Sequence, residues 1–213
     1  MDFINKEILN YSENHTSLPS DLLNKIERET HVQVLRPRML SGHLQGRILS
    51  MFSKMIKPQM ALEIGTYTGY SALCIAEGLK ENGRLITIDI NEELESRVRN
   101  YFAESDFDEQ IDFRIGFAKE IIPTIDEKID LVFIDADKVN YVRYFDLVIG
   151  KMNKGGYIIA DNVLWSGKVL DPKAKNDADT SALIEFNIKV HNDPRVENVL
   201  IPVRDGITVL RVV

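Results

Sequence analysis

Oxygen-bearing side chains follow two apolar runs of this sequence at the points where each run ends. Asp135 comes directly after the run 129–134, and Asp161 and Asn162 come directly after the run 157–160. If the two runs are neighbouring parallel strands, these side chains meet at the carboxyl edge of one sheet. Two carboxylates and an amide oxygen suit a hard divalent cation, Mg²⁺ first and Mn²⁺ or Ca²⁺ as alternatives, that leaves other positions to water or substrate.

Taken singly, either group has a simpler interpretation. Carboxylates at strand ends also cap helices, and Asp161-Asn162 alone is typical of an Asx turn. The occurrence of both groups at one predicted edge, with Lys138 one turn beyond Asp135, favours the metal site.

A metal at this edge would suit an acceptor with two adjacent oxygens on an aromatic ring. The cation would stabilise a phenolate and lower the pKa of the phenol from about 10 toward neutrality. Lys138 is the candidate general base for the phenolic proton, against the alternative of an ordinary solvated lysine. Trp165 is a candidate wall of the acceptor pocket, although a lone buried tryptophan belongs to the core at least as often.

A glycine loop predicts a second ligand site at the same edge. The apolar run 60–64 carries Glu63 and leads into a loop between Gly65 and Gly69, after which a helical pattern begins. A buried strand that turns tightly into a helix opens a doubly wound sheet, and small ligands bind outside its carboxyl end. The spacing differs from the dinucleotide fingerprint, because the side chains of 66–68 would crowd a pyrophosphate.

Glu63 suits a ligand that carries positive charge or hydroxyl donors and has no phosphate. S-adenosylmethionine is such a ligand, with an ammonium, a sulfonium and a ribose diol. The next expected strand, 84–88, ends at Asp89, which is well placed to accept hydrogen bonds from both ribose hydroxyls. The loop, Glu63 and Asp89 together predict an S-adenosylmethionine site.

The elements that position these sites alternate regularly along the chain, which argues for parallel β-α-β units. Helices are expected over 2–12, over 20–30 with Ser20 as N-cap, and from Ser41 as N-cap to Pro58. Asp205-Gly206 between two β-rich runs predicts a closing antiparallel hairpin. The expected strands are 60–64, 84–88, 110–115, 129–134, 156–160, 196–203 and 207–213, and the later helices are 70–80, 92–104, 118–122, 139–152 and 180–191.

The predicted fold class is α/β: a Rossmann-like, doubly wound, mostly parallel sheet with helices on both faces and an antiparallel C-terminal hairpin. We expect a single domain over 1–213, in which helices within 1–57 cover the site and 58–213 form the core. Gly83 and the pair Gly155-Gly156 are interpreted as turns into strands.

Composition narrows the class of protein further. The 213 residues carry a net charge of −7, which argues against a broad nucleic-acid footprint. The lone Cys74 excludes a disulfide or a cysteine metal site and is expected to be buried. Neither a signal peptide nor an apolar run near the ~20 residues of a membrane span is found, so a cytoplasmic protein is expected.

Three ordered motifs resemble one known family. They are Glu63-Ile-Gly-Thr-Tyr-Thr-Gly-Tyr-Ser71, Asp135-Ala-Asp-Lys138-Val-Asn-Tyr141 and Asp161-Asn-Val-Leu-Trp165. They are similar to those of the cation-dependent class I O-methyltransferases, which include the catechol and caffeoyl-coenzyme A O-methyltransferases. The resemblance covers about 38–213.

The resemblance implies a seven-stranded sheet of order 3-2-1-4-5-7-6 and a homodimer. It implies that Asp135, Asp161 and Asn162 hold the metal, and that Lys138 is the base. Asp135 is expected at the junction of the metal and donor sites. The contacts to S-adenosylmethionine that it implies come from Ser41, Glu63, Gly65, Thr66, Ser71, Asp89, Ala118, Asp135 and Asp137.

The departures from this family concern the acceptor. Caffeoyl-coenzyme A enzymes have an asparagine after the tryptophan of the third motif, where this sequence has Ser166. Their insertion rich in arginine and tyrosine has no counterpart in 177–181. These departures argue against selectivity for coenzyme A and leave a small aromatic vicinal diol as the expected substrate.

Three other functions stay open at this point. The first is an O-methyltransferase of tRNA acting on a hydroxylated uridine, with Arg36, Arg38, Arg47 and Lys54 as its basic patch. The second is a nucleotide-binding regulator, which would not need the four polar side chains of the second and third motifs together. The third is a nicotinamide dehydrogenase, which the glycine spacing disfavours.

Overall fold

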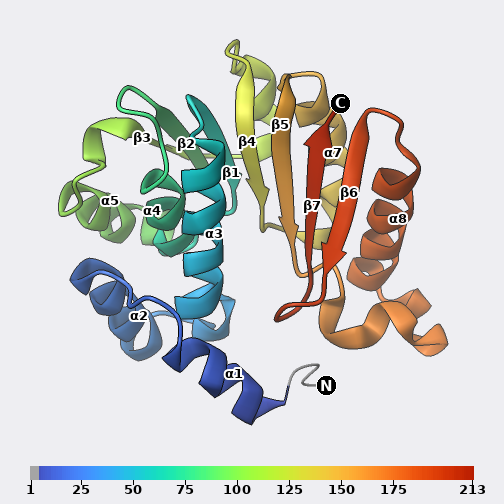
Figure 1. Ribbon diagram of the computed structural model, residues 1–213, viewed down its shortest axis with the longest axis horizontal. Coiled ribbons are helices and arrows are strands. Elements are labelled where there is room, and N and C mark those ends of the chain that lie inside the picture. Colours follow the sequence, from blue (N-terminus) through green and yellow to red (C-terminus); the bar gives the residue numbers. More distant parts are fainter. Residues whose placement is uncertain (1–4) are drawn as a thin grey trace.

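The computed structural model describes residues 5–213, apart from the side chain of Lys175. It contains a seven-stranded sheet of order β3-β2-β1-β4-β5-β7-β6, which confirms the expected order. Strands β1 to β5 pair in parallel, and β7 runs antiparallel to both of its neighbours (Figure 1). The strands are β1 (Met60–Ile64), β2 (Arg84–Asp89), β3 (Ile111–Ile115), β4 (Ile129–Ile134), β5 (Met152–Asp161), β6 (Val196–Ile201) and β7 (Ile207–Val212).

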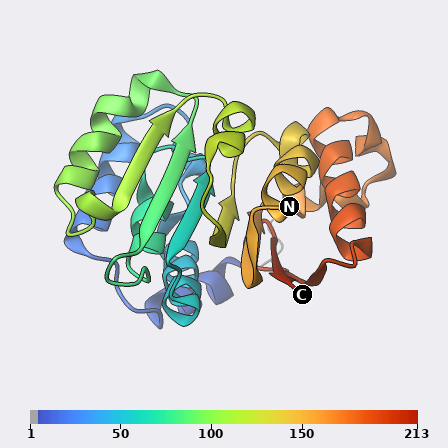
Figure 2. The same cartoon turned by 90° about the horizontal axis from the view of Figure 1, so that it is seen from above.

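Helices cover both faces of the sheet, as Figure 2 shows from above. One face packs against α2, α3, α4 and α5, and the other against α6, α7 and α8. The helices are α1 (Lys6–Asn14), α2 (Asp21–Gln33), α3 (Gly42–Ile56), α4 (Tyr70–Ala76), α5 (Glu95–Ala103), α6 (Ala118–Ile121), α7 (Tyr141–Ile149) and α8 (Ala178–Asn192). None of the helices within 5–213 is long and apolar enough to cross a membrane.

The nearly continuous burial of the central strands agrees with this layering. In β1, Ala61 points into the core on the side of α3 and α4, while Leu62 points into the core beneath α7. Both side chains are fully buried, as expected for a parallel sheet covered on both faces. Cys74 is buried within α4, as predicted.

Several helix boundaries differ from the sequence-based expectation. The first helix spans Lys6–Asn14, and residues 2–4 of the expected range lie outside the described part of the chain. The fourth ends at Ala76 rather than at 80, because Gly78 passes so close to α3 that a Cβ there would lie 2.2 Å from the Ser53 carbonyl carbon. Between β5 and α8 the chain forms two 3₁₀ helices, Trp165–Leu170 and Pro172–Asn176.

One local interpretation of the sequence is wrong, and another is right only in the position of the residue. The pair Gly155-Gly156 is not a turn before β5 but an irregularity inside it, where the pairing with β4 shifts register and Gly155 takes a φ of 80°. Ser41 precedes α3 but does not cap it through its side chain, because its backbone is already helical (φ −57°, ψ −39°). Ser20, in contrast, has an extended backbone and accepts a hydrogen bond from the Leu23 N–H, as predicted.

The carboxyl edge of the parallel strands gathers segments from distant parts of the chain. In Figure 1 the hairpin loop between β6 and β7, the segment 165–176 and α1 all lie toward the lower side of the molecule. Tyr67, in the loop after β1, donates a hydrogen bond from its hydroxyl to the Leu35 carbonyl at 3.0 Å. The segment before α3 is thereby held against the loop between β1 and α4.

Candidate active site

The loop after β1 passes directly beside the loop after β4. Gly65 takes a φ of 102°, and a Cβ on it would lie 2.0 Å from the Asp135 carbonyl oxygen. Its N–H donates to the Ile88 carbonyl at 2.9 Å, and the Asp135 N–H donates to the Ile64 carbonyl at 2.9 Å. Only glycine fits this position, and its fit brings the two sequence-predicted sites into contact.

Glu63 anchors a chain of buried hydroxyl groups under this loop. The Thr87 hydroxyl donates to Oε2 of Glu63 and lies 2.6 Å from the Thr66 hydroxyl. Burial raises the pKa of Glu63 to about 8, although the nearby hydroxyls of Ser71 and Thr87 lower it. The Ser71 contact is not a well-formed hydrogen bond, so Oε1 stays a buried acceptor without a partner. Such an orphaned acceptor fits a ligand that brings a donor or a cation.

Asp89 ends β2 and holds the glycine loop. Its Oδ2 accepts hydrogen bonds from the Thr66 and Tyr67 N–H groups at 3.0 and 2.6 Å, and its Oδ1 accepts from the Asn91 N–H at 2.8 Å. A carboxylate offers about four lone-pair sites, so roughly one remains for a ligand. Asp89 therefore shapes the loop, and its remaining acceptor site is available to the predicted ribose.

Asp135 and Lys138 form an ion pair at the end of β4. The Lys138 ammonium lies 3.0 Å from Oδ1 of Asp135 and donates a second hydrogen bond to the Tyr141 hydroxyl at 2.7 Å. Lys138 is buried, which is unusual for a lysine unless it is paired. The Tyr141 hydroxyl also lies 3.0 Å from the Asp161 carbonyl oxygen, so it joins the ends of β4 and β5.

Asp161 ends β5 and is held from the opposite side by α3. The Gln45 amide donates to Oδ2 of Asp161 at 2.6 Å, and the Asn162 N–H donates to Oδ1 at 2.8 Å. Burial raises the pKa of Asp161, and the negative charge of Asp135 raises it further. Asn162 takes a φ of 59°, a left-handed conformation that asparagine tolerates better than most residues.

These residues fit a divalent cation by the chemistry of their donors. Asp135 and Asp161 repel each other in a buried place, and Lys138 offsets only part of their charge. A cation beside them would remove the repulsion, and the amide of Asn162 is the third predicted oxygen ligand. Within residues 5–213 no three histidine, cysteine or acidic side chains lie close enough together to hold a metal ion by themselves. The candidate site therefore consists of two carboxylates and one amide.

The segment after β5 carries Trp165, the predicted wall of the acceptor pocket, and contacts the β6–β7 hairpin loop. Trp165 packs against the core, and the ammonium groups of Lys138 and Lys168 each lie 5.8 Å from its ring centre. Asp205 in the hairpin loop accepts a hydrogen bond from the Ser166 N–H. Burial raises the pKa of Asp205, and the positive charges of Lys138 and Arg204 lower it. The hairpin loop therefore lies within electrostatic range of Lys138.

The remaining predicted residues are Ser41, Ala118 and Asp137. Ser41 is buried before α3, and Ala118 is buried at the first position of α6. Asp137 lies at the surface, where its carboxylate accepts hydrogen bonds from Asn140 and Tyr144. That carboxylate stabilises the turn into α7 whether or not it also contacts a ligand.

Sequence reasoning missed three residues that the fold brings to the site. Gln45 lies in α3, 116 residues from its partner Asp161, and no local pattern singles it out. Asp205 appeared only as a turn residue of the hairpin. Tyr141 was quoted in the second motif without a role, although its spacing of three from Lys138 would have placed both on one face of a turn.

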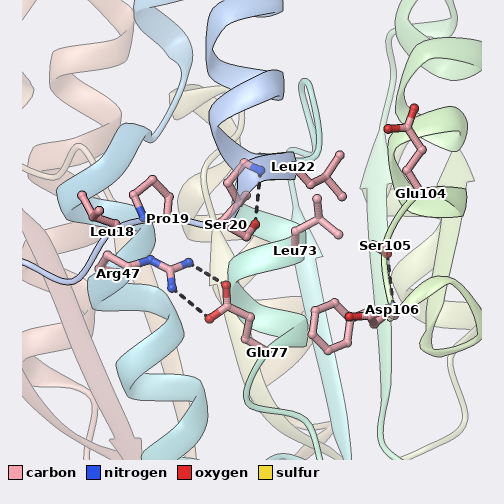
Figure 3. Close-up of a pocket in the computed structure, with 12 residues that line it drawn as sticks. Leu18, Pro19, Ser20, Leu22, Arg47, Leu73, Glu77, Glu104, Ser105 and Asp106 are labelled. Carbon is pink, nitrogen blue, oxygen red and sulfur yellow. Dashed lines mark hydrogen bonds and ion pairs between the residues drawn. The ribbon is translucent and has the colours of Figure 1, made fainter.

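A cavity of about 450 Å³ lies outside this site, between the start of α2, α3, α4 and the connection from α5 to β3 (Figure 3). Arg47 and Glu77 both line it and form an ion pair at 2.7 Å. Lys54 also pairs with Glu77, at 2.9 Å. Two of the four residues of the basic patch expected for tRNA thus share one carboxylate, which offsets one of their two positive charges and counts against that alternative.

Comparison with known proteins assigns the family. A sequence model described as O-methyltransferase matches residues 13–213. The chain is 37% identical over 184 residues to a caffeoyl-CoA O-methyltransferase of Medicago sativa, covering 78% of this chain and 72% of the relative. It is 30% identical over 211 residues to a probable caffeoyl-CoA O-methyltransferase 2 of Dictyostelium discoideum, covering 97% of this chain and 91% of the relative.

Solved structures agree with this assignment. The O-methyltransferase TomG of Streptomyces achromogenes, in complex with SAM, superposes with a TM-score of 0.90 at 26% identity, covering 97% of this chain and 96% of that one. The SAH-bound methyltransferase PaMTH1 of Podospora anserina has a TM-score of 0.89 at 26% identity, covering 99% and 97%. The chain therefore belongs to the O-methyltransferase family, and its enzymatic class is S-adenosylmethionine-dependent O-methyltransferase of the caffeoyl-CoA type.

Proposed function

We propose that this enzyme transfers the methyl group of S-adenosylmethionine to one hydroxyl of a small aromatic vicinal diol. We further propose that it needs a divalent cation, with Mg²⁺ as the preferred ion. One observation carries the proposal. Asp135, which pairs with Lys138, lies beside the Gly65 loop, and its charge acts on Asp161, which Gln45 holds; this arrangement supports adjoining positions for donor and acceptor.

Each residue has a role that follows from its surroundings. Glu63 and Asp89 orient the donor, with the orphaned Oε1 of Glu63 and the remaining acceptor site of Asp89 available to it. Asp135, Asp161 and Asn162 would hold the cation, which when bound lowers the pKa of the acceptor hydroxyl. Trp165 forms one wall of the acceptor pocket and limits the access of water.

Lys138 receives the phenolic proton at its amine nitrogen, and for this it must first release the extra proton that it carries in the ion pair with Asp135. Its two hydrogen bonds, to Asp135 and Tyr141, fix that nitrogen at the junction of β4 and α7. Methyl transfer itself then depends on the alignment of the acceptor oxygen, the methyl carbon and the sulfur, which is a positional effect. Donor contacts from Ser41, Gly65, Thr66, Ser71, Ala118, Asp135 and Asp137 are part of the same proposal.

Titration calorimetry with S-adenosylmethionine and with NAD tests the donor site. Binding of the methyl donor without binding of NAD is expected, because the side chains of 66–68 leave no pyrophosphate cradle. Tight binding of NAD alone would refute the proposal. A homodimer and a cytoplasmic location stay predictions, which sedimentation and localisation of the tagged protein would test.

A further inference from the structure

The loop between β6 and β7 carries a cation that the proposed chemistry does not use. Arg204 lies in this loop with a φ of 49°, in the left-handed region that glycine and asparagine adopt more readily than arginine. Residues held in such conformations concentrate at functional sites. Because this backbone conformation disfavours arginine, we expect the side chain of Arg204 to have a function.

The Arg204 guanidinium lies at the start of α3. Its Nη2 donates to the Leu40 carbonyl at 3.4 Å, and its Nη1 is 3.7 Å from the point where a Cβ on Gly42 would lie. Gln45, three residues further along α3 and on the same face, holds Asp161. The guanidinium therefore borders the acceptor side of the site.

This guanidinium is left largely without partners. Within the described residues Arg204 forms no ion pair, and its one hydrogen bond is the long one to Leu40. The neighbouring carboxylate, Asp205, turns instead to the Ser166 N–H. Arg204 is only half exposed, so water does not fully solvate its five donors.

We propose that Arg204 binds an anionic group of the acceptor, a carboxylate on a short side chain of the catechol ring. The inference rests on the proposed function and narrows its substrate class to dihydroxyphenyl carboxylic acids. The planar guanidinium can bind a carboxylate through two parallel hydrogen bonds. A neutral or cationic substituent on the catechol ring cannot accept both of these hydrogen bonds. The two ring hydroxyls would then face Lys138 and Asp161.

A matched pair of acceptors tests this directly: 3-(3,4-dihydroxyphenyl)propionate and its primary amide, assayed with S-adenosylmethionine and Mg²⁺. Two methylene groups separate the carboxylate from the ring, so the hydroxyls of the two compounds have closely similar acidity. We expect kcat/KM to favour the acid by roughly tenfold, the effect of one charge-assisted contact at a half-exposed site. In Arg204→Asn this preference should vanish through a higher KM for the acid, with the amide unchanged. Arg204→Lys should keep part of it.

Lys57→Asn is the matched control. Lys57 also has a positive φ, of 52°, and is exposed, but it lies at the opposite end of α3, about 22 Å from Gly42 by helical rise. Both asparagine variants should unfold at or above the temperature of the parent protein, since asparagine tolerates this backbone conformation. The control should keep the full preference for the acid.

Two outcomes would overturn the assignment of Arg204. One is equal kcat/KM for acid and amide in the parent enzyme, and the other is an equal loss for both acceptors in Arg204→Asn. Either result, with the amide still methylated, contradicts only the role of Arg204. Failure to methylate any catechol in the presence of Mg²⁺ would instead contradict the proposed function, and the inference with it.

Discussion

Gln45 in α3 donates a hydrogen bond to Oδ2 of Asp161 at the end of β5, at 2.6 Å and across 116 residues of sequence. Both side chains are buried, so this bond fixes the orientation of the carboxylate that is predicted to hold the metal. The helix that precedes the sheet thus contributes to the predicted metal site. Groups that orient metal ligands in this way tune metal affinity.

Replacing Gln45 should weaken activation by the metal. In Gln45→Leu, Oδ2 of Asp161 loses its donor, and the Mg²⁺ concentration for half-maximal activity should rise roughly 10- to 100-fold. The affinity for S-adenosylmethionine should not change. Gln59→Leu is the control, because the Gln59 side chain is exposed and bonds only to Asn82 at the other end of β1. An unchanged Mg²⁺ requirement in Gln45→Leu would show that the bond does not serve the metal site.

The raised pKa of Glu63 predicts that the folded protein loses stability as the pH rises from 4.5 to about 8. Its pKa in the folded protein is about 8, above the 4.5 of an unfolded glutamate, so the folded state holds a proton that the unfolded state releases. The resulting stabilisation is complete below pH 4.5 and is lost as the pH rises to about 8. Without ligands, Glu63→Gln should therefore gain stability relative to the parent between pH 4.5 and 8 and hold that gain above pH 8.

Thermal unfolding of the parent, Glu63→Gln and Glu81→Gln between pH 4.5 and 9 measures this effect. Glu81 is exposed, and its replacement should leave the stability curve of the parent unchanged in shape. A constant difference between Glu63→Gln and the parent over this range would mean that Glu63 is ionised throughout.

Gly65 is predicted to accept no side chain. Gly65→Ala places a Cβ 2.0 Å from the Asp135 carbonyl and requires a φ of 102°, which is strained by about 1–3 kcal/mol before any clash is counted. Urea unfolding should show at least that loss, together with loss of donor binding. Gly150→Ala is the control, since nothing lies within 4 Å of its added Cβ, and it should be neutral or slightly stabilising. Equal stability of the two variants would contradict the close approach of the two loops.

Substitutions of Lys138 distinguish a role as general base from a purely electrostatic role of its positive charge. Lys138→Ala should lower kcat by roughly 10²–10⁴-fold, and Lys138→Arg should not restore it, because a guanidinium cannot accept a proton at neutral pH. Lys168→Ala is the control: its ammonium lies 5.8 Å from the same Trp165 ring, but it pairs with Asp177 rather than Asp135. The readout is the pH–rate profile with catechol and with a nitrocatechol, which is already ionised. Activity of Lys138→Arg within a few-fold of the parent would eliminate the base role.

The sequence predicted well those features that depend on local pattern and on strand ends. Apolar runs followed by Asp89, Asp135 and Asp161 correctly placed three strand termini on one sheet edge, because parallel strands share their carboxyl side. Ser20 was recognised as a cap because its partner Leu23 lies three residues away. In each case the residues that carry the signal lie within a few positions of one another in the sequence.

What the sequence did not reveal depends on contacts between distant segments. The bond from Gln45 to Asp161 and the approach of Asp205 to Ser166 require the whole sheet to be folded. Gly155 looked like a turn residue, since a glycine pair signals either a turn or an irregular strand, and only pairing with β4 decides between them. The left-handed backbone of Arg204 has no counterpart in sequence pattern at all.

Methyl transfer to catechol, with and without the metal, tests the central claim most directly. The enzyme is freed of metal with a chelator and assayed with S-adenosylmethionine and catechol, before and after Mg²⁺ is added. We predict background activity in the chelator and full recovery with Mg²⁺, with Asp135→Ala and Asp161→Ala inactive in both conditions while their donor affinity stays within about tenfold, ~1.4 kcal/mol. Full activity in excess chelator would contradict the claim that Asp135, Asp161 and Asn162 act through a bound cation.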